Sequence, residues 1–244
     1  MQKSNLRYYL HLHLIVFIWG FTAILGKLIS IDAIPLVWYR MLLASFFIAV
    51  YFLIKKKSFE LDKKSLFKFL LSGILIALHW ITFFKAIKVS NVSVALVVMS
   101  TGAFFTSLIE PIFFKRRINA VEIILGLIVV GGLYIIFSFE SQYALGIVYA
   151  LISSFLSALF SVLNGLFVRK HSASLISFYQ LFFGALFITV YLFFKGSFTI
   201  NFFVPTDPLV LPNIYFVWLI LSFILITQRP VTLNQIYCFL LFEN

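Results

Sequence analysis

HWITFFKAIKVSNVSVALVVMSTGAFFTSLIEPIFFKRRINAVEIILG, residues His79–Gly126, is the stretch that decides the fold of this 244-residue chain. It contains the end of one apolar run, the whole of a second and the start of a third. Two short polar connections separate these runs, at Lys88–Asn91 and Lys115–Asn119. The middle run ends in Glu110-Pro111, shortly before the basic cluster of the second connection. Long apolar runs joined by short polar turns are typical of a polytopic membrane protein.

The composition excludes a water-soluble domain. Hydrophobic residues make up 63% of the chain and charged residues 11%, whereas charged residues are roughly a quarter of an ordinary soluble domain. The apolar runs recur at about the 20 residues that a helix needs to cross ~30 Å of hydrocarbon. Lipid offers no partners to unpaired backbone groups, and the alternating pattern of a membrane β-barrel is absent. We therefore predict an all-α integral membrane protein.

Motifs of enzymes and of metal sites are missing from the sequence. There is no P-loop, no G-x-S-x-G and no H-E-x-x-H, and nothing pairs carboxylates for acid–base catalysis. The single cysteine, Cys238, excludes an internal disulfide and a cysteine-based metal site. We expect no catalytic residues, no metal and no cofactor.

Eight transmembrane spans are predicted from the apolar runs. They cover residues 11–31, 34–54, 67–87, 92–114, 120–139, 143–166, 174–195 and 209–227. Short loops join the first seven spans, so consecutive helices should be antiparallel neighbours. The first run follows two basic residues, as in a signal peptide, but no small-x-small cleavage site follows it. We expect that run to be retained as the first transmembrane helix.

Basic residues gather on the side of these spans that the N-terminus occupies. Fourteen of the nineteen Lys and Arg residues lie there, namely Lys3, Arg7, Lys55, Lys56, Lys57, Lys63, Lys64, Lys68, Lys115, Arg116, Arg117, Arg169, Lys170 and Arg229. The other five are Lys27, Arg40, Lys85, Lys88 and Lys195. An excess of Lys and Arg marks cytoplasmic loops, so we predict a cytoplasmic N-terminus in the inner (plasma) membrane. The net charge of +11 then requires no nucleic-acid partner.

The chain also contains an internal repeat. Residues 38–51 align without gaps to residues 178–191, with identities at Tyr39/Tyr179, Phe47/Phe187, Ile48/Ile188, Val50/Val190 and Tyr51/Tyr191. The two segments are the second and the seventh predicted spans, five helices apart. An odd number of helices inverts the second copy in the membrane, and inverted repeats are the architecture of many secondary transporters.

Several segments resemble the EamA family of the drug/metabolite transporter superfamily. The matching positions are Trp19, Gly20, Lys27, Pro35 and Arg40 for the opening of its first repeat, 83–95 (FFKAIKVSNVSVA) for its third-to-fourth helix hairpin, 122–132 for its fifth helix, and Gly146 onward for its second repeat. The likeness covers about residues 11–195. The resemblance implies ten helices in two inverted five-helix repeats that carry small organic solutes across the cytoplasmic membrane.

On this resemblance, the chain divides into three parts. Residues 11–139 correspond to a complete first repeat, 143–227 to a partial second repeat of about three helices, and 228–244 to an atypical tail. About eight of the family's helices are then present. Two hypotheses follow. The chain is either a permease that works by alternating access on a gradient, or a truncated, non-transporting protein or half-module that needs a partner chain.

Three charged or titratable groups within the predicted spans each have two interpretations. Arg40 either serves a function inside the membrane or snorkels to the outer headgroups. Glu110 either carries a proton or cation near the inner side or forms an ion pair with the basic cluster 115–117. His79 either takes part in proton coupling or is a hydrogen-bonded packing residue. We expect the second role for Glu110 and His79, and both remain open for Arg40.

The remaining candidates for substrate binding or gating are Trp19, Trp80, Asn164, Tyr179 and Gln180. Gln180 takes the place of Arg40 in the repeat, so the two positions are not electrically equivalent. We expect the polar run Ser100–Gly102 mainly to let helices approach closely, and we expect Lys27, Lys85 and Lys88 at the outer interface. The expected partners are a small-molecule substrate and the lipid bilayer, with a homodimer as one option.

Overall fold

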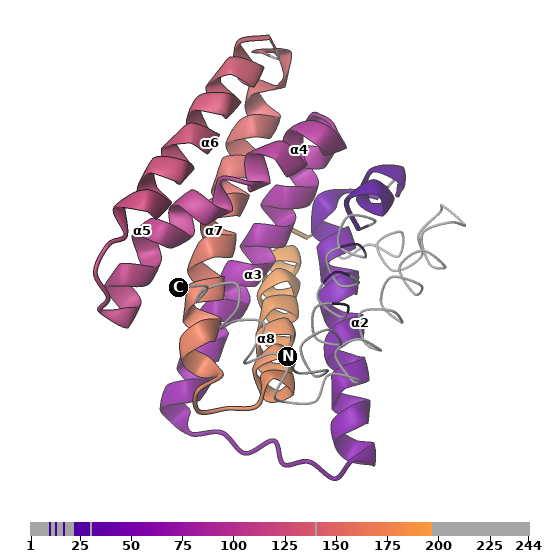
Figure 1. Ribbon diagram of the computed structural model, residues 1–244. Coiled ribbons are helices and arrows are strands. Elements are labelled where there is room, and N and C mark those ends of the chain that lie inside the picture. Colours follow the sequence, from indigo (N-terminus) through magenta and orange to yellow (C-terminus); the bar gives the residue numbers. More distant parts are fainter. Residues whose placement is uncertain are drawn as a thin grey trace.

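The computed structural model describes residues 10, 13, 17, 22–29, 31–139 and 141–196, which form helices and short connections with no β-strand (Figure 1). Its elements are α2 (Ala33–Ile54), α3 (Lys63–Val89), α4 (Val92–Met99), α5 (Gly102–Phe114), α6 (Ala120–Phe139), the 3-10 turn η1 (Ser141–Tyr143), α7 (Ala144–Phe167) and α8 (Ala173–Phe194). Residues 22–28 are also helical. In this part of the chain five helical segments are long and apolar enough to cross a membrane, and α6 contains a shorter apolar stretch. The prediction of an all-α polytopic bundle is confirmed.

The predicted spans agree with the helices wherever the structure describes them. Spans 34–54, 67–87, 120–139, 143–166 and 174–195 fall on α2, α3, α6, α7 and α8, and α3 begins a few residues earlier than predicted. Span 11–31 is described only in part. Span 209–227 and the tail 228–244 lie outside the described residues.

One predicted span, 92–114, is divided into α4 and α5. The backbone N–H groups of Ser100 and Thr101 donate to the carbonyls of Val97 and Val98, three residues back, at 3.2 and 3.0 Å. The two hydroxyls donate to the same carbonyls at 2.6 and 2.7 Å. Hydroxyls that bond back to the preceding turn compete with regular helical hydrogen bonding. The predicted span 92–114 is long and apolar enough as a whole to cross a membrane, and it is interrupted at Ser100 and Thr101.

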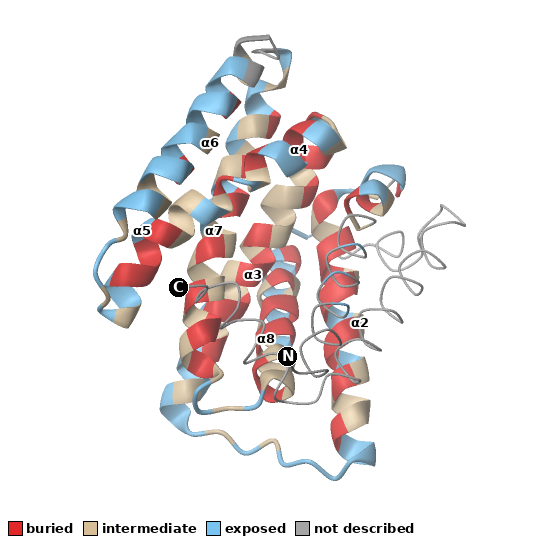
Figure 2. Ribbon diagram, in the orientation of Figure 1, coloured by how far each residue is buried: buried red, intermediate tan, exposed pale blue. Residues whose placement is uncertain are grey.

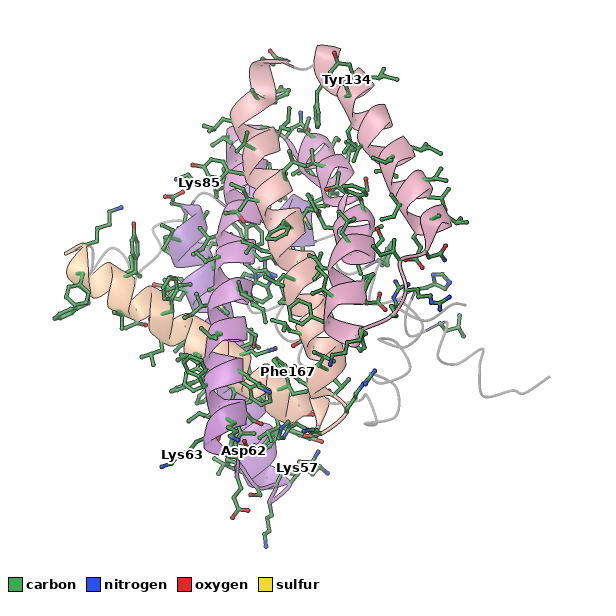
Figure 3. All side chains as sticks on the ribbon, turned by 90° about the vertical axis from the view of Figure 1, so that its left-hand side faces the viewer. Lys57, Asp62, Lys63, Lys85, Tyr134 and Phe167 are labelled. Carbon is green, nitrogen blue, oxygen red and sulfur yellow. The ribbon has the colours of Figure 1, made fainter. Side chains whose placement is uncertain are left out.

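Apart from α4 and α5, which continue in one direction, consecutive helices run in opposite directions, as predicted (Figure 1). The connections at 55–62 and 168–172, which hold basic residues, lie at the lower end of the bundle in this view, and the basic connection at 115–119 joins the lower ends of α5 and α6 on the left. Figure 3 places Lys57 and Lys63 at this end and Tyr134 at the opposite end. Two of the basic connections therefore share one end of the bundle, and the third joins the ends of α5 and α6 that point the same way.

α3 lies at the centre of the bundle. It packs against α7 and α8, while α2 also packs on α8 and α5 packs on α7. Gly73 of α3 and Gly184 of α8 make the crossing of these two helices close, because a Cβ atom at Gly73 would lie 2.5 Å from the carbonyl oxygen of Gln180. Small residues at a crossing let two backbones approach in this way.

Many residues of α6 are exposed (Figure 2), and the exposed side chains include many large apolar ones. Ile128 is 65% exposed and Tyr134 78% exposed, and both lie on α6. Within the described residues, α6 packs chiefly against α5. Such a surface would be unfavourable in water but is compatible with lipid chains.

Candidate functional site

Buried polar side chains occupy the interior of this apolar bundle. Among the described residues they are Arg40, Ser45, Ser72, His79, Ser90, Thr101, Ser107, Glu110, Ser153, Ser154, Asn164 and Gln180. Burying a polar group costs free energy unless the group is hydrogen-bonded. Polar groups inside a membrane bundle are therefore the first place to look for a binding site.

His79, in α3, is hydrogen-bonded to α7. Its Nδ1 lies 2.8 Å from both the carbonyl oxygen and the hydroxyl of Ser153, and this hydroxyl donates to the carbonyl of His79 at 2.9 Å. The rings of Phe83 and Phe160 lie on the imidazole, with centroids 6.2 and 5.3 Å away. The hydrogen-bonded, packed arrangement expected for His79 is thus present. A role in proton coupling stays a prediction.

Ser154, the next residue of α7, reaches the division between α4 and α5. Oγ1 of Thr101 lies 2.9 Å from Oγ of Ser154, and Ser154 donates to the carbonyl of Met99 at 3.2 Å. Ser153 and Ser154 are fully buried. The adjacent residues Ser153 and Ser154 therefore link His79 to the division between α4 and α5.

Gln180 joins three helices. Its side-chain amide donates to Oγ of Ser72 in α3 at 2.8 Å and to Oδ1 of Asn164 in α7 at 2.6 Å. All three residues are buried. Because each amide and hydroxyl has a partner here, the cluster stabilises the packing of α8 against α3 and α7.

Arg40 lies inside the bundle between aromatic rings. The central carbon of its guanidinium is 5.2 Å from the ring centroid of Trp80 and 4.7 Å from that of Phe84. Only 6% of Arg40 is exposed. Snorkelling would place the charged head at the end of the bundle. The structure instead holds the cation over aromatic faces, which attract it.

Glu110 and Glu122 share one arginine at the α5–α6 connection. Nε of Arg116 lies 3.0 Å from Glu110, which is 2% exposed, and its NH2 group lies 2.8 Å from Glu122. Asn119 also donates to Glu122, at 3.2 Å. Hydrogen bonding to Glu122, together with the bond to Glu110, raises the pKa of Arg116. The ion pair expected between Glu110 and the basic cluster is therefore present.

Two lysines connect residues 22–29 to α3. Nζ of Lys27 donates to the carbonyls of Ile87 and Ser90, both at 3.1 Å, and Nζ of Lys88 donates to the carbonyl of Ile29 at 2.8 Å. Carbonyls at the C-terminus of a helix have no intrahelical donor. The ammonium group of Lys27 therefore satisfies carbonyls at the C-terminal end of α3, and that of Lys88 satisfies a carbonyl at the C-terminal end of the 22–28 helix.

A comparison with known families identifies the chain. The sequence profile of the EamA-like transporter family matches residues 6–138, more than half of the chain. The chain belongs to the EamA-like transporter family. It is thus a multi-pass membrane transporter of the drug/metabolite transporter superfamily, whose EamA members are transporters rather than enzymes. No curated protein matches the sequence.

The EamA-like bundle brings some of the predicted site residues together. Arg40 packs on Trp80, and Asn164 bonds to Gln180. Tyr179 does not face these groups, because its hydroxyl donates to the carbonyl of Phe59 in the 55–62 connection at 2.6 Å. Glu110 is likewise at the α5–α6 connection with Arg116. Trp19 lies outside the described residues.

Four residues of the site were not predicted, namely Ser72, Phe84, Ser153 and Ser154. A weak signal was present in α7, where Ser153 and Asn164 lie eleven residues apart, about three helical turns, and therefore on one face; Ser154, Ser157 and Ser161 are further polar residues of the same helix. No such signal marks Phe84 among so many phenylalanines. The described residues of this EamA-like chain contain no group of three or more His, Cys, Asp or Glu that could hold a metal ion.

Proposed function

We propose that this EamA-like chain moves a small organic solute across the plasma membrane by alternating access, driven by a gradient. The observation that carries the proposal is the correspondence of α2 and α8. Both helices are 22 residues long and begin after an extended N-cap residue, Asp32 and Ser172. At their ends the N–H of Lys55 bonds to Leu53 and Tyr51, and the N–H of Lys195 bonds to Phe193 and Tyr191.

The buried faces of α2 and α8 also correspond. The matching buried pairs are Leu36/Ile176, Arg40/Gln180, Met41/Leu181, Ala44/Gly184, Ser45/Ala185, Ile48/Ile188 and Phe52/Leu192. The two helices pack on each other and run in opposite directions (Figure 1). Equivalent helices in opposite directions support an inverted repeat, whose halves rock about a site near the membrane midplane.

The polar interior between these halves is the proposed solute site. Arg40 and Trp80 contribute a cation and an aromatic face, and Gln180 and Asn164 contribute amide groups. Cationic, aromatic and amide groups suit an organic solute that has both polar and apolar parts. The absence of a nucleotide-binding motif in the sequence supports a gradient as the source of energy.

The test is solute flux in proteoliposomes. The purified chain is reconstituted and offered radiolabelled amino acids, nucleosides and organic acids under imposed proton and sodium gradients. We expect gradient-dependent flux of at least one solute, reduced at least tenfold by Arg40→Gln. Lys64→Gln, which removes a positive charge at an exposed position, is the control and should leave flux unchanged. Flux that persists when every gradient is collapsed would contradict gradient coupling.

A further inference from the structure

The two ring nitrogens of His79 have different surroundings. Nδ1 lies 2.8 Å from the carbonyl oxygen of Ser153, and a carbonyl can only accept, so Nδ1 carries a hydrogen. The hydroxyl of Ser153 donates its hydrogen to the carbonyl of His79. Nε2 makes no hydrogen bond to any residue of the described ranges. The neutral ring therefore keeps its lone pair on Nε2, where a proton can bind without breaking a protein hydrogen bond.

We propose that Nε2 of His79 is a proton-binding site, and that proton binding there is linked to opening of the bundle at the division between α4 and α5. This inference rests on the proposed transport function and names its coupling ion. The link runs through α7, where Ser153 bonds to His79 and Ser154 bonds to Thr101 and Met99. A movement of the His79 ring is thus transmitted through α7 to Thr101 and Met99, at the division between α4 and α5.

The neighbouring charges make the protonated ring unfavourable in this packed state. Among the described helical segments that pack against α3, the charged side chains are Arg40 of α2 and Lys27 of residues 22–28, and α4, α7 and α8 carry none. Tyrosines on these helices are Tyr39, Tyr51, Tyr149, Tyr179 and Tyr191, and α3 itself has Lys85 beyond Phe83. Phe83 and Phe160 enclose the ring. A protonated His79 is a second cation in this region. The helices that pack against α3 offer it no carboxylate, and the buried ring meets little water.

The proton consequently binds more tightly to a state in which water reaches Nε2. A ligand shifts a conformational equilibrium by its difference in affinity for the two states, so protonation favours the hydrated, open state. In the step itself, a hydronium ion transfers its proton to the Nε2 lone pair: one O–H bond breaks, one N–H bond forms, a water molecule is left, and the charge of the ring rises by one. Release to water on the other side reverses the step, and no other group is consumed.

The first experiment follows His79 directly. The full chain is labelled with ¹⁵N-histidine in lipid nanodiscs, and the ring nitrogens are observed by NMR as the pH is lowered. His79→Asn assigns the signal, because Asn keeps a donor near the Nδ1 position and has no titrating nitrogen. If this variant does not fold, replacing His11, His13 and His171 assigns the signal by elimination. We expect reversible protonation of His79 as the pH is lowered. A His79 that stays neutral throughout the titration overturns the proposal.

The second experiment follows the division between α4 and α5. Hydrogen–deuterium exchange of amides 99–105, corrected for the intrinsic effect of pH, should become about tenfold faster with the same midpoint as His79, a typical size for linkage between sites. In His79→Asn the exchange should not depend on pH. Exchange that responds to pH equally in both proteins overturns the link. Neither experiment uses a solute, so failure here is distinct from failure of the flux assay, which tests the proposed function.

Discussion

Arg40 and Gln180 occupy the same register in two 22-residue helices that pack against each other in opposite directions. Both residues are buried, yet their partners differ. Arg40 lies over Trp80 and Phe84, whereas Gln180 bonds to Ser72 and Asn164. The two sides of the proposed solute site therefore differ, because one presents a cation and the other a neutral amide.

Replacing Gln180 by Leu should destabilise the bundle. The change leaves Ser72 and Asn164 without the amide that joins them, and buried hydrogen bonds between membrane helices are worth about 0.6 kcal/mol on average and up to ~1.7 kcal/mol. We expect a loss of about 1 kcal/mol in the free energy of unfolding, measured by SDS titration in mixed micelles. Gln142→Leu, at an exposed position, is the control and should change little. Equal effects of the two changes would show that the Gln180 cluster does not stabilise the packing.

Replacing Gly73 by Ala should be far more harmful than the same change at Gly131. A Cβ at Gly73 would meet the backbone oxygen of Gln180 at 2.5 Å, whereas nothing lies within 4 Å of a Cβ at Gly131. Overpacking costs typically ~1–3 kcal/mol because helices must move apart. The same unfolding titration should show this loss for Gly73→Ala and none for Gly131→Ala. A tolerated Gly73→Ala would mean that α3 and α8 do not cross so closely.

Removing Arg116 should destabilise the α5–α6 connection in a pH-dependent way. Arg116→Gln leaves the buried Glu110 and its neighbour Glu122 without their shared cation. We expect a loss of about 1–3 kcal/mol near neutral pH, less than for a fully buried pair because Arg116 is 27% exposed. Protonated carboxyl groups need no cation, so the loss should shrink as the pH falls toward about 4. Arg117→Gln, at an exposed position, serves as the control.

Cysteine labelling should show the end with the basic connections on the cytoplasmic side. Ser58→Cys reports on the 55–62 connection and Gln142→Cys on η1 at the opposite end, each with Cys238 replaced by Ser. A membrane-impermeant maleimide added to intact cells should label Gln142→Cys, and Ser58→Cys should react only after lysis. The reverse pattern would invert the predicted orientation.

Much of the fold was predictable because the signals are local. The loops Lys88–Asn91 and Lys115–Asn119 separate helices at the expected places, and the gapless alignment of 38–51 with 178–191 agrees with the equal bounds and buried faces of α2 and α8. Hydropathy and length decide which segments cross a membrane, whatever their neighbours are. The ion pair of Glu110 was also accessible, since Arg116 follows within two helical turns.

The contacts that define the candidate site were decided by tertiary structure alone. Sequence pattern could mark His79 as a mid-span titratable group, but only the packing of α3 on α7 shows that Ser153 bonds to Nδ1 and leaves Nε2 without a bond to the described residues. Tertiary structure likewise pairs the hydroxyl of Tyr179 with the carbonyl of Phe59, and it divides span 92–114 at Thr101. The reason is physical. A helix's length depends on its own residues, whereas the meeting of two side chains depends on how each helix is rotated and where the helices cross.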